Sequence, residues 1–340
     1  MAKRVNLKAL PKEGLLHFVR DAGLPRYRSD QLIHWIYEKH ACGLAEISEF
    51  SMELRSTLED LAYISNLEVA KLLKSQDGTE KFLFTLEDGE TIESVLIPDK
   101  DRLTLCISSQ VGCAMGCRFC LTGRLGLVRN LKAFEITDQL IAVNRILHPR
   151  KITNIVLMGM GEPLANLDEV VEALWRITGF LGVPKRRITL STSGLAPKIA
   201  LFAERAPEVN LAVSLNATTD KQRDEIMPVN RRYPIKSLLA ACRSFPLGPR
   251  RRITFEYVLM QGINDSLGDA ARLVKLVGGI PCKINLIPLN PHAESGLKRP
   301  ADSTVLEFQK VLTDHGLIAI IRESKGQDIL AACGQLRAGH

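Results

Sequence analysis

The feature that most constrains the fold is an alternation of short apolar runs with helical stretches, which begins near residue 100 and continues to about residue 290. The runs are rich in β-branched residues and nearly continuous in hydrophobicity, which is typical of strands buried on both faces of a sheet. Helical stretches separate them, so the pattern predicts an α/β fold with a parallel sheet or partial barrel. In such folds ligand-binding residues gather at the C-terminal ends of the strands. The six runs are residues 103–109, 155–161, 188–194, 211–216, 253–260 and 284–288.

The first 98 residues follow different patterns. Apolar residues recur at helical spacing from about residue 6 to residue 63, which predicts a small helical domain. Two alternating runs in residues 81–98 flank Asp88-Gly89, a strong signal for a β-hairpin. Because 340 residues exceed the usual size of one simple core, we divide the chain into three parts. These are an N-terminal helical accessory domain (1–63), a linker with the β-hairpin (64–98) and a catalytic domain (99–340).

The composition narrows the class of protein. With 46% hydrophobic and 24% charged residues, the chain has an ordinary globular composition. No segment reaches the roughly 18 consecutive apolar residues that cross a bilayer, and the first residues lack the apolar core of a secretory signal. We therefore expect a cytoplasmic protein without membrane contact. In a reducing compartment, the eight cysteines favour metal binding or catalysis over structural disulfides.

Three of the cysteines, Cys113, Cys117 and Cys120, follow the first predicted strand of the α/β region. The spacing C-x3-C-x2-C allows three thiolates to hold one face of a 4Fe-4S cluster, and one iron is left to chelate the amino and carboxylate groups of a small molecule. Gly112 and Gly116 would let the backbone wrap around this cluster. The alternatives are three buried thiols or a zinc site without its fourth ligand, although zinc sites normally show four ligands in paired spacing.

Five further segments follow the cysteines in a fixed order: residues 158–166, 190–194, 213–217, 285–291 and 328–336. Together with the cysteine segment they resemble the RlmN family, radical S-adenosyl-L-methionine (SAM) enzymes that methylate C2 of adenine in ribosomal and transfer RNA. The resemblance implies an α/β fold containing a partial (β/α)6 barrel of the radical SAM type. It also implies two SAM molecules consumed per methylation.

The resemblance assigns catalytic roles as well. C2 of adenine is electron-poor and cannot attack the methyl group of SAM, so the family uses a radical route. By resemblance, Cys333 carries the methyl group, Cys106 releases the product by forming a disulfide with Cys333, and Glu93 accepts the C2 proton. From the residues alone, Cys106 could also be a core cysteine and Glu93 a surface carboxylate. Three other cysteines match no motif and are expected to be small buried side chains: Cys42, Cys242 and Cys282.

The residues that the resemblance implies for SAM binding lie at strand ends, where glycine permits close approach and polar side chains offer oriented hydrogen bonds. They are Gly161, Glu162, Ser191, Ser214, Leu215, Asn216 and Asn290. Ser191 and Ser214 could instead only cap the ends of strands. Many family members have His where this chain has Asn216, so we expect an uncharged hydrogen-bonding amide at that position.

A net charge of +7 and basic clusters at residues 185–187, 231–236 and 250–252 favour a polyanionic partner, although each cluster could be a solvated face. The resemblance implies 23S ribosomal RNA and transfer RNA as substrates, with the target adenine extruded. It also implies an external electron donor such as flavodoxin or ferredoxin, and we expect a monomer. Two alternatives remain: methylation of adenine C8 by related resistance enzymes, and a non-catalytic RNA-binding protein with a structural cluster.

Overall fold

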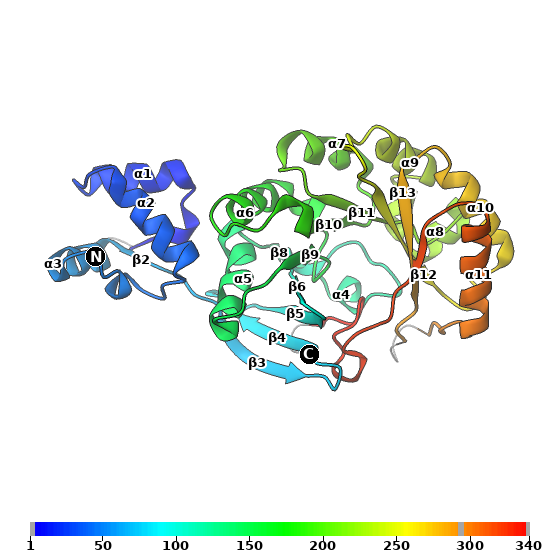
Figure 1. The fold of residues 1–340 in the computed structure, drawn as a ribbon, viewed down its shortest axis with the longest axis horizontal. Helices are drawn as coiled ribbons and strands as arrows, with labels where there is room; N and C mark the ends of the chain where they lie inside the picture. Colours follow the sequence, from blue (N-terminus) through cyan, green and yellow to red (C-terminus); the bar gives the residue numbers. More distant parts are fainter. Residues whose placement is uncertain (1–3, 292–295, 338–340) are drawn as a thin grey trace.

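A ten-stranded sheet dominates the computed structural model, which describes residues 4–291 and 296–337 (Figure 1). Its strand order is β14-β13-β12-β11-β10-β9-β6-β5-β4-β3. The strands from β6 to β14 pair in parallel, and β5, β4 and β3 continue the sheet in antiparallel pairing. The sheet curves with helices on its outer side (Figure 1), so the predicted α/β partial barrel is confirmed.

All six predicted runs form strands, namely β6 (Arg102–Cys106), β9 (Asn154–Leu157), β10 (Ile188–Thr192), β11 (Asn210–Ser214), β12 (Ile253–Leu259) and β13 (Cys282–Pro288). A further parallel strand, β14 (Ala319–Ile321), was not predicted, because three residues are too few to show a strand pattern. None of the helices in the described ranges is long and apolar enough to cross a membrane. The helices that connect the strands are α5 (Ala133–Leu147), α6 (Leu167–Gly179), α7 (Ala196–Arg205), α8 (Asp220–Ile226), α9 (Ile235–Arg243), α10 (Leu267–Val277) and α11 (Asp302–Asp314).

The strands place apolar side chains under the helices and polar ones inside the barrel. In β12, Phe255 and Tyr257 belong to the main core, and the Tyr257 ring lies 5.3 Å from that of Phe308 in α11. Because successive strand residues point to opposite faces, Glu256 points into the barrel. The same alternation turns Ser191 of β10 inward between the buried residues Leu190 and Thr192. The interior is therefore lined by side chains that can bind a polar ligand.

The predicted hairpin is part of the main sheet. β4 (Glu80–Thr85) and β5 (Thr91–Asp99) turn at Asp88-Gly89, and β3 (Glu68–Lys74) pairs with β4 on the outer edge. β5 also pairs with β6, and the buried rings of Phe82 and Phe84 join the barrel core. The hairpin sequence alone shows its own turn but not the strand on which it docks.

The N-terminal residues form the predicted helical unit with a core of its own. It contains α1 (Lys12–Asp21), α2 (Tyr27–Ile33), a π-helical turn (His34–Glu38) and α3 (Met52–Leu61). Ser51 caps α3 by accepting a hydrogen bond from the backbone N–H of Leu54 at 3.2 Å. Two short strands, β1 (Val5–Asn6) and β2 (Ala62–Tyr63), pair in parallel and bring the two ends of the unit together. Its apolar core consists of Leu7, Leu15, Val19, Leu32, Ile36, Tyr37, Leu44, Ile47, Phe50, Leu58, Ala62 and Ile64, together with Ile141 of α5.

A buried polar network fixes this unit to the barrel. Lys8 Nζ lies 2.7 Å from Asp138 Oδ1 in α5, and both side chains are at most 2% exposed. Arg176 of α6 donates to the carbonyl oxygen of Lys8 at 2.6 Å and to the Tyr37 hydroxyl at 3.3 Å. Burial lowers the pKa of Lys8 and raises that of Asp138, since desolvation disfavours both charges. Removing either partner would therefore leave the other charge buried without a counter-charge, which destabilises the fold.

Asp138→Asn tests this dependence. The substitution leaves the Lys8 ammonium buried without a counter-charge, so we expect the free energy of unfolding to fall by about 3 kcal/mol. Urea unfolding followed by the fluorescence of Trp35, which packs against the N-terminal core, measures the change. The double variant Lys8→Met/Asp138→Leu removes both charges and should recover most of the loss. Equal stability of the single variant and the parent protein would contradict the prediction.

Candidate active site

The three clustered cysteines lie on a ribbon just beyond the C-terminal end of β6. β7 (Gln110–Cys113) pairs antiparallel with β8 (Gly126–Asn130), and the short helix α4 (Leu121–Arg124) lies between them in the chain. Gly112 has a φ of +74°, and a Cβ atom there would lie 2.0 Å from the carbonyl oxygen of Gly126. No side chain fits this position, so the ribbon can close tightly directly before Cys113.

Burial and mutual proximity set the chemistry of the three thiols. Cys113 and Cys117 are buried, and Cys120 is half-buried. Burial raises the pKa of Cys113 to about 12 and holds the pKa of Cys117 well above its usual value. The charges of Cys120 and Cys113 raise the pKa of Cys117 further. Three thiolates can therefore coexist here only when they bind a positively charged group such as iron.

This arrangement fits the predicted 4Fe-4S cluster. A cube takes one thiolate on each of three irons, so the three sulfur atoms need not converge on one point. Among the described residues, no group of three His, Cys, Asp or Glu side chains has the geometry to hold a single metal ion. Cys113, Cys117 and Cys120 are the residues that would hold the cluster.

A buried guanidinium lies beside this loop. Arg223 of α8 is fully buried, and it donates to the carbonyl oxygens of Leu215 at 3.0 Å, Ser193 at 2.6 Å and Ser214 at 3.0 Å. Burial lowers its pKa to about 10, so it stays charged at neutral pH, and its charge lowers the pKa of Cys117. Arg223 thus joins the ends of β10 and β11 and favours a thiolate. Arg223 was not identified from the sequence, because α8 contains several charged residues and nothing in the sequence shows which of them is buried.

Glu162 connects the ends of β9 and β10. Its Oε1 accepts hydrogen bonds from the Thr192 hydroxyl at 2.7 Å and the Leu164 N–H at 3.1 Å, and its Oε2 accepts from the Ser193 N–H at 2.6 Å. Gly161 before it has a φ of +101°, and a Cβ atom there would lie 2.6 Å from the Gln110 side chain. The glycine is therefore required for the close approach of the Gln110 side chain. The Glu162 carboxylate is largely occupied within the protein and mainly positions the strand ends.

Unsatisfied buried polar atoms indicate where a ligand would bind. Ser193 Oγ, Asn290 Oδ1 and Gln335 Oε1 are buried and have no hydrogen-bond partner among the described residues. They belong to the end of β10, the segment after β13 and the C-terminal residues beside Cys333. Buried polar atoms normally have partners, so a polar ligand such as SAM, with its amino, carboxylate and hydroxyl groups, fits this site. Of the predicted binding residues, Ser191 and Ser214 are partly exposed beside it.

Asn216 has a different environment from the one we expected of a ligand-binding residue. It is fully buried with a φ of +56°, a conformation that Asn adopts more readily than most residues. Its Oδ1 accepts from the Val258 N–H at 2.8 Å, and its Nδ2 donates to the Met227 sulfur at 3.2 Å. The amide holds the end of β11 against β12. The neighbouring predicted residue, Leu215, is also fully buried.

Cys106 and Glu93 share the inner face of the sheet. Cys106 ends β6 and lies opposite Val95 of β5, and Glu93 is two residues away from Val95 on the same face. Glu93 is buried, with its Oε1 3.0 Å from Lys81 Nζ and its Oε2 accepting from the Arg337 N–H at 2.7 Å. The alternative of a surface carboxylate is therefore wrong. The hairpin pattern could not reveal this, because the C-terminal residues cover the face that carries Glu93.

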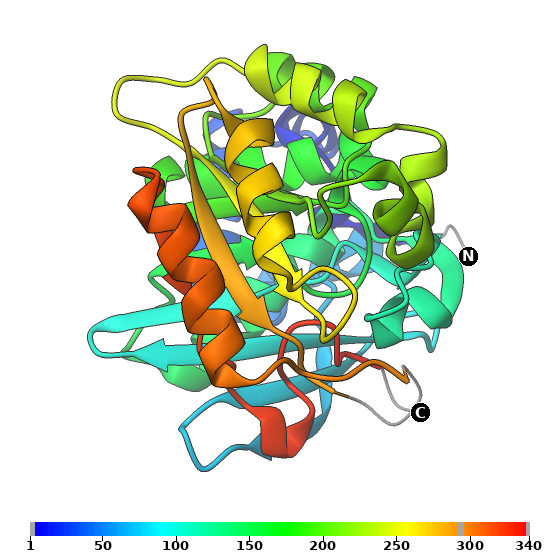
Figure 2. The same cartoon turned by 90° about the vertical axis from the view of Figure 1, so that its right-hand side faces the viewer.

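The C-terminal segment (residues 326–337) brings Cys333 to this place. Figure 2 shows this red segment beside the light-blue turn between β3 and β4. The carbonyl oxygen of Cys333 accepts a hydrogen bond from Asn290 at 3.3 Å, and that of Gly334 accepts from the Leu121 N–H at 2.7 Å. Arg337 of the same segment donates its N–H to Glu93, which shares a face of the sheet with Cys106. The segment thus places Cys333 beside the cluster loop and between contacts to Asn290 and Glu93.

Desolvation keeps both thiols protonated, so a nucleophilic attack by either sulfur requires prior loss of its proton. Solvent reaches the Cys333 side chain, yet the surrounding protein raises the pKa of this thiol to about 11, mainly through desolvation. Cys106 is buried, and burial raises its pKa strongly. Both cysteines are free, and the described residues contain no disulfide. Of the other cysteines, Cys242 and Cys282 are buried as expected, but Cys42 is exposed, so its expected burial is wrong.

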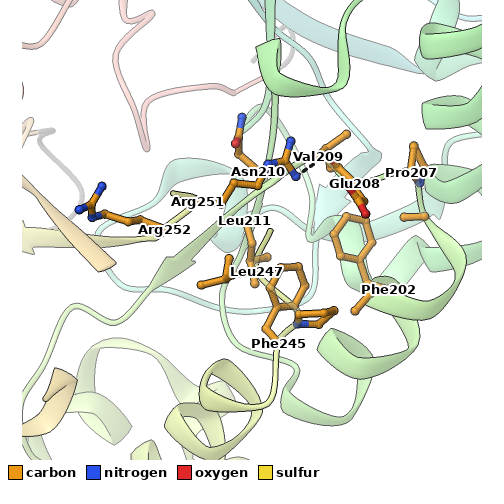
Figure 3. Close-up of a pocket in the computed structure, with 13 residues that line it drawn as sticks. Phe202, Pro207, Glu208, Val209, Asn210, Leu211, Phe245, Leu247, Arg251 and Arg252 are labelled. Carbon is orange, nitrogen blue, oxygen red and sulfur yellow. Dashed lines mark hydrogen bonds between the residues drawn. The ribbon is translucent and has the colours of Figure 1, made fainter. Parts of the chain in front are cut away.

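The basic clusters do not all lie at this end of the barrel. Residues 185–187 and 250–252 directly precede β10 and β12, and therefore lie at the N-terminal ends of the strands. A pocket of about 90 Å³ lies at that opposite end, with Phe202 and Phe245 in its wall, and Arg251 donates to the carbonyl oxygen of Glu208 at 2.7 Å (Figure 3). Only the cluster at 231–236 follows a strand end on the cysteine side, where Arg231 and Arg232 are exposed. Two of the three clusters are thus remote from the candidate site.

Replacing Cys117 tests the cluster site. In Cys117→Ala one iron loses its protein ligand, so anaerobic reconstitution should yield well under half of the iron and sulfide that the parent protein binds, about four of each. Cys42→Ala is the matched control, since Cys42 is exposed and far from the loop in the chain. Iron and sulfide analysis with visible absorption gives the result. Full cluster content in Cys117→Ala would remove this residue from the ligand set.

Comparisons with known proteins agree with this site. Residues 5–64 match the family model "Ribosomal RNA large subunit methyltransferase N-terminal domain", and residues 107–274 match "Radical SAM superfamily". The "Dual-specificity RNA methyltransferase RlmN" of Pelobacter propionicus is 51% identical over 99% of this chain and 97% of its own length. That of Geobacter sulfurreducens is also 51% identical, over 99% of this chain and 93% of its own length.

A solved structure extends the similarity to the whole fold. A radical SAM methyltransferase from Sphaerobacter thermophilus superposes with a TM-score of 0.94 at 42% identity, over 98% of this chain and 99% of that one. The sequence identity, the matched N-terminal unit and the cysteine ribbon thus point to one family. The chain belongs to the RlmN family of radical SAM methyltransferases.

Proposed function

We propose that the protein methylates C2 of an adenine in RNA and that Cys333 carries the methyl group. The observation that carries this proposal is the position of the segment that holds Cys333: Gly334 bonds to Leu121 beside the cysteine ribbon, and Arg337 bonds to Glu93, which lies on the same face of the sheet as Cys106. The relatives reported above are named as RlmN enzymes, which does not favour the alternative of C8 methylation.

The electron-poor C2 atom requires radical chemistry. When bound, the cluster and SAM supply a carbon-centred radical that can remove hydrogen from an unactivated methyl group. The chain supplies position and shields the reaction from water. Cys113, Cys117 and Cys120 hold the cluster, while Asn290, Ser191 and Ser214 line the polar site proposed for SAM.

Three side chains then carry out the transfer. The Cys333 thiolate first takes a methyl group from one SAM by displacement. After this carbon has bonded to C2, Glu93 accepts the C2 proton. Cys106 then attacks the sulfur of Cys333 as a thiolate and a disulfide forms. The carbon leaves with the electron pair of the broken sulfur–carbon bond and takes up a proton to become the methyl group. The free thiols of the structure correspond to the reduced state from which the first transfer starts.

For the RNA, we propose 23S ribosomal RNA and transfer RNA. The relatives are named dual-specificity RNA methyltransferases, and the N-terminal match carries a ribosomal RNA name. Arg231, Arg232 and Lys236 are exposed near the strand end that precedes them and can contact phosphates. The N-terminal helical domain would add a second RNA-contacting surface. The target adenine must leave its stack to reach Cys333.

An external protein is the source of the electron in this proposal. Outside the ribbon and the Cys106–Cys333 pair, the remaining cysteines are one exposed residue and two scattered in the core, so they offer no second cluster site: Cys42, Cys242 and Cys282. We therefore propose a cytoplasmic donor such as flavodoxin or ferredoxin, acting on the protein as a monomer.

Cys333→Ala should abolish methylation, because no sulfur remains to receive the methyl group. The cluster ligands are untouched, so visible absorption and iron content should match the parent protein. Mass analysis of nucleosides from treated RNA measures 2-methyladenosine. Retained product would exclude Cys333 as the carrier, and 8-methyladenosine in its place from the parent protein would exclude the C2 assignment.

Cys106→Ala should stop the reaction one step later. Methyl transfer to Cys333 and addition to the base need no second thiol, but release does. We expect a protein–RNA adduct to accumulate under turnover and to migrate as one species on a denaturing gel. The matched control is Cys242→Ala, a buried core cysteine outside the site, which should turn over normally. Normal product release from Cys106→Ala would contradict this role.

A further inference from the structure

Lys81 of β4 links Glu93 to the C-terminal segment. Its Nζ lies 3.0 Å from Glu93 Oε1 and donates to the carbonyl oxygen of Leu330 at 3.2 Å. The other carboxylate oxygen, Oε2, accepts from the backbone N–H of Arg337 at 2.7 Å. The ion pair therefore contacts the C-terminal segment both before and after Cys333.

The pair has little freedom to rearrange. Lys81 lies opposite Val95, and Glu93 lies opposite Leu83, so both charged side chains project from the same face of the β4–β5 hairpin. Their side chains are 9% and 7% exposed. A buried charge that loses its partner is costly, so neither group can turn out to solvent independently of the other.

The contact at Leu330 occurs where the backbone is strained. Leu330 has a φ of +53°, a left-handed conformation that costs a residue with a side chain about 1 kcal/mol. The backbone N–H of Ala331 donates to the carbonyl oxygen of Gly326 at 2.8 Å, and Lys81 binds the Leu330 carbonyl. These bonds hold the bend that leads the chain to Cys333.

Separate contacts hold the beginning of the C-terminal segment. Asp328 accepts from the Ser75 hydroxyl at 2.6 Å and from the Gln76 N–H at 3.2 Å, and Asp77 accepts from the Gly326 N–H at 2.9 Å. The segment would therefore stay attached to the β3–β4 turn without Lys81. The contribution of Lys81 is specific to the stretch from Leu330 to Arg337, which carries Cys333.

We propose that Lys81 is a positioning residue that sets Glu93 and the sulfur of Cys333 in one fixed geometry. The proposal rests on the proposed function, in which Cys333 holds the carbon bonded to C2 while Glu93 removes the proton from C2. A base must lie within hydrogen-bond reach of the proton, and a misplacement of about 1 Å can cost about a hundredfold in rate. Lys81 itself transfers no proton.

The test compares Lys81→Met with Lys81→Arg in anaerobically reconstituted holoenzyme. Lys81→Met keeps the apolar stem but loses the charge and the donor, whereas Lys81→Arg retains both. Three readouts are followed with SAM, reductant and RNA: mass of the methylated Cys333 peptide, 5′-deoxyadenosine, and the ratio of protein–RNA adduct to 2-methyladenosine. Lys74→Met is the matched control, since Lys74 of β3 pairs at 2.8 Å with Glu80 on the neighbouring antiparallel strand β4 but is 66% exposed.

We expect Lys81→Met to methylate Cys333 and to form 5′-deoxyadenosine within about twofold of the parent protein. Release of 2-methyladenosine should fall at least about tenfold, with adduct accumulating, because proton removal is the step that needs the fixed geometry. Lys81→Arg should recover most of the release rate, and Lys74→Met should behave as the parent protein.

Two outcomes would overturn the proposal. One is normal product release by Lys81→Met, and the other is an equal loss at all three readouts, which would indicate only a structural role for the ion pair. If Lys81→Met proves unstable, Lys81→Gln retains a donor without the charge and allows the same comparison. Glu93→Gln in the same assay distinguishes failure of this proposal from failure of the proposed function. If the adduct accumulates in Glu93→Gln but not in Lys81→Met, the positioning role of Lys81 is rejected. If Glu93→Gln releases product normally, Glu93 is not the base.

Discussion

Three thiols within the eight residues from Cys113 to Cys120 impose the condition on which the rest of the site depends. Burial raises the pKa of all three thiols, and repulsion between their charges raises the pKa of Cys117 further. The loop can therefore act as a set of thiolate ligands only when iron is bound and positive charge lies nearby. The buried Arg223 guanidinium supplies such a charge, and its hydrogen bonds to three strand-end carbonyls fix it there. The same bonds order the ends of β10 and β11, so one residue affects both the electrostatics of the ribbon and the shape of the site proposed for SAM.

Local patterns predicted the fold well where the elements are long. Six apolar runs became six parallel strands, and Asp88-Gly89 forms the turn of the hairpin. What the patterns could not provide were pairings decided by tertiary contacts. The hairpin docks on β6 because Phe82 and Phe84 join the barrel core, and β14 has only three residues whose pairing depends on β13.

The sequence allowed us to name candidate residues for the site, but not the contacts that their side chains make. Glu162 and Asn216 lie at strand ends as expected, but their side chains bind the protein itself, since each occupies a junction where two strand ends must be held together. No sequence pattern indicated that Arg223 and Lys81 are buried, because the burial of a single charged side chain depends on partners that are far away in the chain. Lys81 and Leu330, for example, are 249 residues apart.

The two halves of the site are held by different kinds of interaction. Close packing at Gly112, where a Cβ atom would lie 2.0 Å from the carbonyl oxygen of Gly126, holds the cysteine ribbon closed. The segment that carries Cys333 is held instead by hydrogen bonds to Asp77, Ser75, Lys81 and Glu93. Hydrogen bonds to charged groups contribute about 1.5–3 kcal/mol each, and those of Lys81 and Glu93 are buried and are therefore not readily exchanged for bonds to water. In the proposed function, the buried pair of Lys81 and Glu93, through its bonds to Leu330 and Arg337, keeps the segment that carries Cys333 beside Glu93, while the close approach at Gly112 keeps the cysteine ribbon closed.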